Sequence, residues 1–208
     1  MFLLSPARCD GQRAEMVLSP RAAFPLARRL RESGGAPLGE VMSFMSGLYF
    51  RGKLTYAETF ARCAAADGVL VITQDSGLRP PATPVTVESL RQAACVDIDA
   101  ANPRYREPLE TSAAALTARL SAHDEVVLLG SIASSKYVDV LTGIFGERLL
   151  FPAEFVGRGD MSRGGLLLRC ARAGLELTYV PVLGAVRTGS RPPKLAPLPR
   201  VASPIGRR

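Results

Sequence analysis

Five short apolar runs constrain the fold most, because none of them alternates with polar residues. They are FLLS (2–5), VLVIT (69–73), EVVLLG (125–130), RLLFP (148–152) and LTYVPV (177–182). Unbroken runs of leucine and β-branched residues are typical of strands buried on both faces, as in a parallel or mixed sheet covered by helices. We therefore expect these five segments to form one internal sheet.

Helical patterns separate the five runs. They lie at 11–33, 38–49, 53–66, 108–120, 134–145 and 164–174. Pro20 and Pro25 limit the continuity of the first pattern, which holds one or two helices. Strands that alternate with helices of this length predict an α/β fold: three α/β/α layers around a mainly parallel, roughly five-stranded sheet.

The chain has 208 residues, which is enough for one domain with a sizeable core. We place that domain at 1–186 and a basic tail at 187–208. The tail holds six basic residues, five prolines and no acidic residue, so it accounts for most of the net charge of +7. A segment of this composition cannot build a core, and we expect it to be extended or disordered. It either contacts nucleic acid or another acidic surface, or is simply solvated.

Several classes of protein do not fit this sequence. No apolar run reaches the roughly 18 residues of a membrane span, and the N-terminus lacks the features of a secretory signal, so we expect a cytoplasmic protein without membrane contact. The four cysteines are widely spaced, which argues against a structural zinc site, and we expect no metal and no cofactor. The single histidine, His123, is read as a surface residue, which argues against Ser-His-Asp and Cys-His mechanisms.

Polar or glycine-containing loops follow four of the predicted strands. In an open α/β sheet, ligands bind beyond the carboxyl ends of the strands, so four such loops would line one cleft if the strands run parallel. The candidate residues of the first three loops are Ser5 and Arg8, Asp75, and Ser131, Ser135 and Lys136.

The third loop, GSIASSKY, shares a Gly, two Ser and a Lys with a Walker A loop. It lacks the second glycine directly before Lys136 and the Ser or Thr after it, so a P-loop NTPase is not indicated. Ser134 or Ser135 would cap the following helix, either leaving N–H groups for an anion or serving the cap alone.

The fourth loop, FVGRGDMSRGG (155–165), is the most distinctive stretch of the chain. Gly157 and Gly159 allow a close backbone approach, and Asp160 or Ser162 would cap the next helix. Arg158 and Arg163 carry forked guanidinium groups that suit phosphate or carboxylate. The stretch predicts an anion- or nucleotide-binding loop. The alternative is a capped turn with solvent-facing arginines.

Two further segments stay open at this stage. SGLYFRGKLTYAETF (46–60) places Tyr49, Arg51, Lys53 and Tyr56 around an expected helix break at Gly52. It would either stack on a base and hold its phosphate or form a helix–helix turn with buried aromatics. The proline-rich region 75–108 is either a lid or a structural excursion over the sheet edge.

The order of these features resembles that of bacterial YaaA-like (peroxide-stress protein) α/β domains and, more distantly, of domains with a uracil-DNA-glycosylase-like sheet. The segments that carry the resemblance are FLLSPARCDGQRA, LYFRGKLTYA, VLVITQDSGL, VVLLGSIASSKYVDVL and FVGRGDMSRGGLLL, within residues 1–183. The Gln-Asp-Pro-Tyr run of the glycosylases is absent, and Gln74-Asp75 echoes only part of it. The resemblance implies a nucleotide or nucleic-acid connection without a catalytic assignment.

Three functions are then weighed. The first is an enzyme acting on a nucleotide or nucleic acid, with Asp75 or Asp160 as general base or electrostatic stabiliser in N-glycosidic or related hydrolytic chemistry. In that case Lys136, Arg158 and Arg163 would hold phosphate. The second is a non-catalytic module that binds nucleic acid or a phosphorylated ligand with the help of the basic tail. The third is a structural or partner-binding protein. The sequence does not indicate an oligomeric state.

Overall fold

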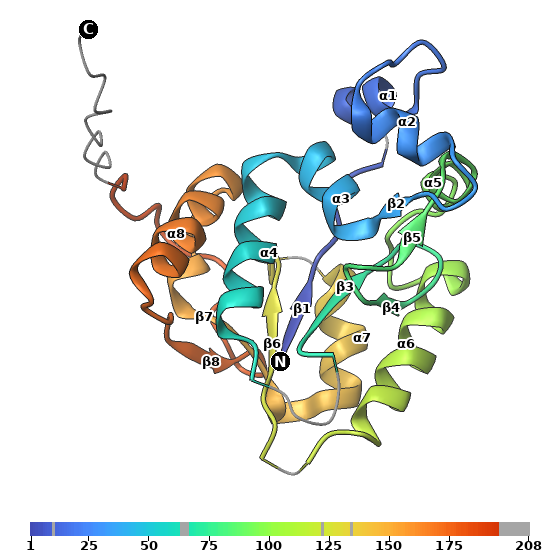
Figure 1. Ribbon diagram of the computed structural model, residues 1–208. Coiled ribbons are helices and arrows are strands. Elements are labelled where there is room, and N and C mark those ends of the chain that lie inside the picture. Colours follow the sequence, from blue (N-terminus) through green and yellow to red (C-terminus); the bar gives the residue numbers. More distant parts are fainter. Residues whose placement is uncertain (10, 63–66, 122, 134, 196–208) are drawn as a thin grey trace, which may run out of the picture.

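A six-stranded sheet runs through the middle of the protein, with helices on both of its faces (Figure 1). The computed structural model describes residues 1–9, 11–62, 67–121, 123–133 and 135–195. The strands, in spatial order, are β4 (Leu78–Arg79), β3 (Val69–Ile72), β1 (Phe2–Leu4), β6 (Val126–Leu129), β7 (Leu149–Pro152) and β8 (Tyr179–Pro181). The four inner strands are parallel and the two edge strands are antiparallel to their neighbours. The predicted fold class, a three-layer α/β fold with a mainly parallel sheet, is confirmed.

The central strand β1 shows why the apolar runs lack alternation. Leu3 lies opposite Leu70 of β3 and Leu128 of β6, and all three side chains are buried. Every residue of β1, β3, β6 and β7 is buried, because helices cover both faces of these strands.

Two groups of helices cover the sheet. One face carries α3 (Leu38–Ser46), α4 (Leu48–Phe60) and α8 (Asp160–Ala173), and the other carries α6 (Pro103–Thr117) and α7 (Ser135–Phe145). Beyond the top of the sheet lie α1 (Gln12–Leu18), α2 (Pro25–Arg31), α5 (Val87–Ala94) and the small second sheet of β2 (Ala36–Pro37) with β5 (Pro84–Val85). Two short 3-10 helices, η1 (Gly146–Arg148) and η2 (Ala153–Phe155), flank β7. No helix in the described part of the chain is both long and apolar enough to span a membrane.

Several details of the sequence prediction need correction. The sheet has six strands, one more than the five predicted. The additional strand, β4, has only two residues and no apolar run that would mark it in the sequence. The break between α3 and α4 lies at Gly47, which has a φ of +62°, and Gly52 lies inside α4. The region 75–108, for which a lid and a structural excursion were both open, contains β4, β5, α5 and the start of α6.

Candidate functional site at the carboxyl ends of the strands

The loops after β1, β3, β6 and β7 leave the same edge of the sheet, because these four strands are parallel. The chain passes from β1 to β3 on one side and later to β6 on the other, so β1 and β6 border the point where the strand order reverses. Ligands of open α/β sheets bind at such a point. The polar residues at this edge are therefore the first place to look for a site.

A pocket of about 290 Å³ opens at this edge. It is lined by Pro6, Ala7, Arg8, Gln74, Ala94, Asp97, Ile98, Lys136 and Tyr137. We call it the carboxyl-end pocket. Arg8 follows β1 and Lys136 is the second residue of α7, and both side chains are exposed. Two cationic groups and one carboxylate thus meet there from three separate segments.

Gln74 adds a polar wall to the carboxyl-end pocket. Its Nε2 donates to the carbonyl of Val96 at 3.2 Å, whereas its Oε1 is buried and has no hydrogen-bond partner in the described structure. A buried acceptor without a donor is costly. A ligand N–H or O–H group would relieve that cost.

Behind the loops, four polar or charged side chains other than tyrosines are buried in the described part of the chain. Ser5 and Thr73 directly follow β1 and β3, and Lys53 and Arg163 come from α4 and α8. Thr73 is used locally, since its Oγ1 donates to the carbonyl of Gly77 at 2.8 Å and closes the turn into β4. The other three belong to a buried polar cluster.

In that cluster, the ammonium group of Lys53 reaches the end of β1. Its Nζ donates to the carbonyl oxygen of Ser5 and lies 2.9 Å from Ser5 Oγ. It also lies 4.5 Å from the ring centre of Tyr49 and 4.9 Å from that of Phe50. Burial lowers the pKa of Lys53 to about 7.

Arg163 fills a neighbouring part of the same cluster. Its Nε and Nη2 donate to the carbonyl of Phe155 at 3.2 and 3.0 Å, and Nη1 lies 3.5 Å from Asp160 Oδ1. The Tyr49 hydroxyl is buried without a hydrogen-bond partner among the described residues, and burial raises its pKa. Burial also raises the pKa of Tyr137 to about 12, with a smaller effect of Asp160 in the same direction. Tyr137 therefore links the cluster to the carboxyl-end pocket.

Arg158 lies in different surroundings from Arg163. Its guanidinium donates to the carbonyl of Glu154 at 2.9 Å, to Ser162 Oγ at 3.3 Å and to the carbonyl of Pro193 at 3.5 Å. The two arginines of the fourth loop therefore do not form one fork around an anion. Residues 187–195, which we call the C-terminal strap, lie outside any helix or strand and pass over Gly157.

A second hollow, of about 340 Å³, lies between the strap and α8. Its lining includes four cationic residues and no acidic one: Arg158, Arg169, Arg191 and Lys194. We call it the α8 groove. Gly159, the predicted close-approach position, also lines it. The strap supplies two of the four charges, Arg191 and Lys194.

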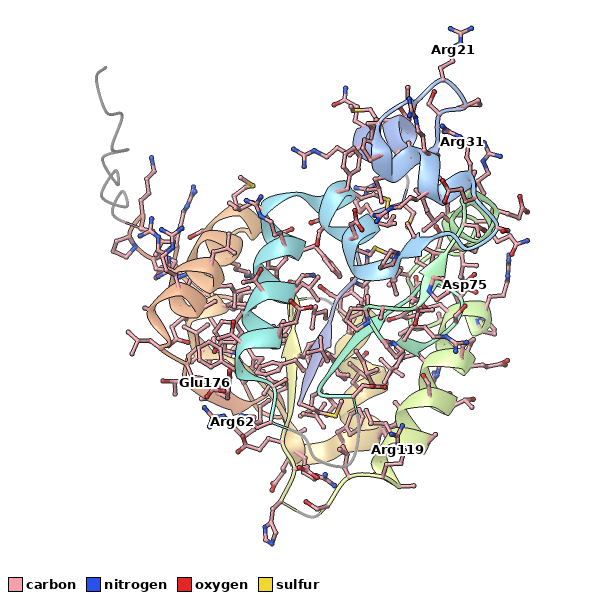
Figure 2. The ribbon with its side chains drawn as sticks, in the orientation of Figure 1. Arg21, Arg31, Arg62, Asp75, Arg119 and Glu176 are labelled. Carbon is pink, nitrogen blue, oxygen red and sulfur yellow. The ribbon has the colours of Figure 1, made fainter. Side chains whose placement is uncertain are left out.

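The remaining predicted residues are dispersed. Ser131 Oγ accepts from the N–H of Ala133 at 3.4 Å, and Ser135 is the exposed first residue of α7; neither lines the carboxyl-end pocket. Asp75 sits at the β3–β4 turn (Figure 2), accepts from Ser76 Oγ at 2.9 Å, and lines a separate hollow of about 210 Å³. Asp160 is the exposed first residue of α8 and pairs with Arg163.

The expected side-chain caps are not all present. The N-cap of α8 is Gly159 without a side-chain hydrogen bond, so neither Asp160 nor Ser162 caps the helix. Asp160 instead lies in the first turn, where its negative charge interacts favourably with the helix dipole. Ser134 and residues 196–208 of the tail lie outside the described residues.

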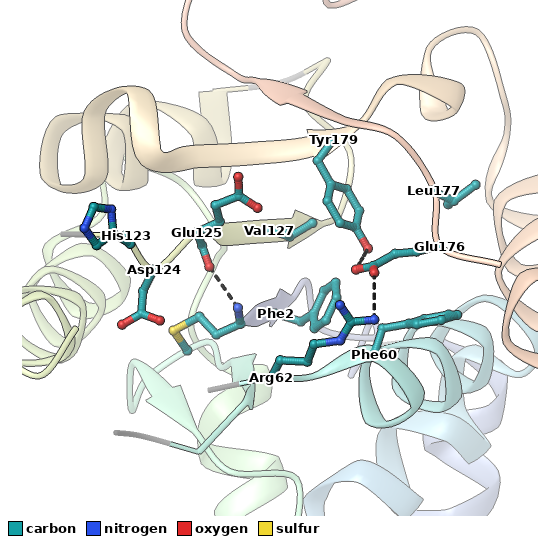
Figure 3. Close-up of a pocket in the computed structure, with 11 residues that line it drawn as sticks. Phe2, Phe60, Arg62, His123, Asp124, Glu125, Val127, Glu176, Leu177 and Tyr179 are labelled. Carbon is teal, nitrogen blue, oxygen red and sulfur yellow. Dashed lines mark hydrogen bonds and ion pairs between the residues drawn. The ribbon is translucent and has the colours of Figure 1, made fainter. Parts of the chain in front are cut away.

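Another hollow lies at the opposite end of the sheet, near the start of β1 (Figure 3). It measures about 390 Å³, and its polar groups are engaged with one another. Arg62 lies 3.5 Å from Glu176, Tyr179 donates to Glu176 at 2.9 Å, and the Met1 ammonium donates to the carbonyl of Glu125 at 2.8 Å. Sequence reasoning did not anticipate this hollow, and its paired groups do not favour it as a site. Exposed His123 is on its rim, in keeping with the surface reading.

No group of three or more His, Cys, Asp or Glu within the described ranges is arranged to hold a metal ion. Comparisons with protein-family models, with curated proteins and with solved structures found no match to this chain. The carboxyl-end pocket, the buried cluster and the α8 groove are therefore the features of this chain that indicate a function.

Proposed function

We propose that the protein binds a small phosphate-bearing ligand, of nucleotide type, in the carboxyl-end pocket. One observation carries the proposal: Arg8 and Lys136, 128 positions apart in the chain, line the same pocket beside the reversal of strand order. Exposed cationic side chains at this place suit the phosphate of a ligand, and the buried acceptor of Gln74 suits a donor on its base. The resemblance to YaaA-like domains implies the same class of ligand.

The proposal is for binding and contains no hydrolytic step through Asp75 or Asp160. Neither carboxylate is among the residues that line the pocket. N-glycosidic chemistry needs a carboxylate close to the scissile bond, and the pocket offers only Asp97 in that capacity.

A thermal-shift screen tests this proposal. Wild-type protein is heated with inorganic phosphate, pyrophosphate and nucleoside mono-, di- and triphosphates. We expect at least one phosphorylated compound to raise the melting temperature, because a ligand that binds only the folded state stabilises it. Lys136→Ala and Arg8→Ala should each weaken binding about tenfold or more, on the scale of a charge-assisted contact of ~1.5 kcal/mol.

Arg172→Ala is the matched control, since Arg172 is an exposed arginine in the last turn of α8, away from the pocket. If no phosphorylated compound shifts the wild-type melting temperature, or if Lys136→Ala and Arg172→Ala behave alike, the proposal is wrong.

The α8 groove supports a second candidate function, the binding of a nucleic-acid backbone. Four cationic side chains around one groove, without a carboxylate among the lining residues, would attract successive phosphates. The test is the salt dependence of oligonucleotide binding, measured by fluorescence anisotropy. Arg169→Ala and Lys194→Ala should each lower the slope of log K against log [salt] by about one.

The two candidates separate cleanly. Lys136→Ala should leave oligonucleotide binding unchanged, and Arg169→Ala should leave the nucleotide-induced thermal shift unchanged. A wild-type protein that binds no oligonucleotide at low salt would eliminate the second candidate.

A further inference from the structure

Ser5 and Lys53 are two of the buried polar residues whose arrangement the binding proposal does not use. Ser5 is the first residue after the central strand β1, next to the reversal of strand order, and is 5% exposed. Lys53 comes from α4 and is 1% exposed. Their side chains lie 2.9 Å apart, and Ser5 Oγ lies 3.3 Å from the carbonyl of Leu129 at the end of β6. A serine hydroxyl and a lysine amine are thus in hydrogen-bond contact at the carboxyl edge of the parallel strands.

The surroundings of Lys53 keep its amine in a form that accepts a proton. No carboxylate forms an ion pair with it in the described structure, and a lysine buried without such a partner favours its neutral form. The charged or titratable groups that face it are Tyr49 on its own helix and Asp160 and Arg163 on α8. Burial has the largest effect and lowers the pKa of Lys53 to about 7. Asp160 raises this pKa and Arg163 lowers it, both by smaller amounts.

We propose that Ser5 and Lys53 form a nucleophile and general-base pair for acyl transfer from an ester or amide ligand. Neutral Lys53 Nζ takes the proton of Ser5 Oγ as Oγ forms a bond to the carbonyl carbon of the ligand. The resulting ammonium then gives that proton to the departing alcohol or amine as the old bond breaks. Water, deprotonated by the same amine, then forms a bond to the acyl carbon and the bond to Ser5 Oγ breaks. The ammonium returns its proton to Oγ, and the acyl group leaves as a carboxylic acid.

The pair lies directly behind the wall of the carboxyl-end pocket, although neither Ser5 nor Lys53 lines it. Pro6 and Ala7, the two residues that follow Ser5, form part of the wall of the carboxyl-end pocket. Gly130 lies against Ser5 on the other side, since a Cβ at position 130 would be 3.1 Å from Ser5 Oγ. The ring of Tyr49 packs against the Lys53 amine, whose Nζ lies 4.5 Å from the ring centre. The inference concerns a reaction and is independent of phosphate binding.

An alkyl fluorophosphonate tests the pair directly, because it reacts with activated serines and releases fluoride. Full-length protein is incubated with the probe between pH 5 and 9, and the adduct is located by mass spectrometry in the tryptic peptide 1–8. We expect an adduct on Ser5, with a labelling rate that rises through pH 7 and levels off above pH 8, as the amine becomes neutral. Lys53→Met should lower that rate at least a hundredfold, and Ser5→Ala should abolish the adduct.

Ser43→Ala, a half-buried serine on α3, is the matched control and should label like the wild type. Circular dichroism and melting curves confirm that each variant is folded. If Lys53→Met does not fold, the pH profile of the wild type decides. The proposal is overturned if folded wild-type protein gives no adduct on Ser5 at pH 8 to 9, if Lys53→Met labels at the wild-type rate, or if the wild-type rate does not change through pH 7.

Discussion

At the residue scale, Arg163 and Arg158 differ in what their guanidinium groups contact. Arg163 is 8% exposed, and its guanidinium donates to the carbonyl of Phe155 and pairs with Asp160. Arg158 is only half-buried and lies at the α8 groove, with the strap as one of its partners. Lys53 is more buried than either and has no ion pair in the described structure. Buried cations need compensation from hydrogen bonds or pairing, and here carbonyl oxygens at strand and helix ends provide part of it.

Lys53→Met tests the cost of that burial. The lysine has a pKa of about 7 in the folded state and an ordinary value of 10.5. Between these values the unfolded chain binds the extra proton, so the wild-type free energy of unfolding should rise with pH from 7 towards 10.5. Below pH 7 both states carry the proton and the full cost applies. The methionine variant lacks this dependence.

Urea unfolding at pH 6, 7, 8 and 9 measures the effect. The difference in unfolding free energy between wild type and Lys53→Met should shift in favour of the wild type by a few kcal/mol across this range, since each pKa unit corresponds to about 1.4 kcal/mol. Exposed Lys136→Met is the control and should follow the wild-type curve. Parallel curves for wild type and Lys53→Met would contradict a lowered pKa.

At the element scale, the contact between α4 and α8 depends on two glycines. A Cβ at Gly164 would lie 2.7 Å from the carbonyl oxygen of Leu48 and 2.8 Å from Tyr49 Cα. A Cβ at Gly52 would lie 2.6 Å from the carbonyl oxygen of Gly164. The two helix backbones therefore touch, and this approach holds Lys53 and Arg163 in one cluster. Gly52 was expected to break a helix and in fact allows two helices to meet.

Gly164→Ala should destabilise the protein by roughly 1–3 kcal/mol, the usual cost of overpacking, because backbone atoms cannot give way as a flexible side chain would. Gly165→Ala is the matched control in the same helix. Its Cβ would meet only Leu195 Cδ1, at 3.5 Å, so the variant should gain up to about 1 kcal/mol of helix propensity. Chemical denaturation compares the two. Equal stability of the two variants would show that the helices are not in tight contact at Gly164.

At the scale of the whole molecule, the C-terminal strap is seated on a turn of the body. Gly157 has a φ of +70°, and a Cβ at this position would lie 2.1 Å from the carbonyl oxygen of Ser190. Arg187 lies 3.9 Å from Asp139 of α7, and Arg158 donates to the carbonyl of Pro193. The first part of the basic tail, residues 187–195, thus contacts the body of the protein and completes the α8 groove.

Gly157→Ala should release the strap, because alanine is strained at positive φ and collides with the strap backbone. Limited trypsin digestion should then cut after Arg187 and Lys194 several-fold faster than in the wild type. Gly159→Ala is the control, since nothing lies within 4 Å of its Cβ position and its φ is negative. Unchanged cleavage in Gly157→Ala would mean that the strap is not held at this turn.

The arrangement of the whole molecule shows which residues of the candidate site could be predicted from the sequence. The loops after β1 and β6 were identified from the residues that follow each apolar run, and Arg8 and Lys136 indeed line one pocket. Lys53 was noted only as a basic residue among aromatics, and no local pattern separates a buried lysine from an exposed one. Asp75 and Asp160 were chosen as carboxylates in polar loops, and the structure puts them in two different places.

The sequence by itself determined five of the six strands, because strands of a helix-covered sheet are unbroken apolar runs that can be recognised locally. It did not separate the four inner strands from β8, which the structure shows as a half-buried antiparallel edge strand. It also determined that their loops share an edge, since strands joined through helices run parallel. The tertiary structure alone decided the order of the strands, the approach of α4 to α8 through Gly52 and Gly164, and the contact of Lys53 with Ser5. These depend on packing between segments tens of residues apart, which no local pattern records.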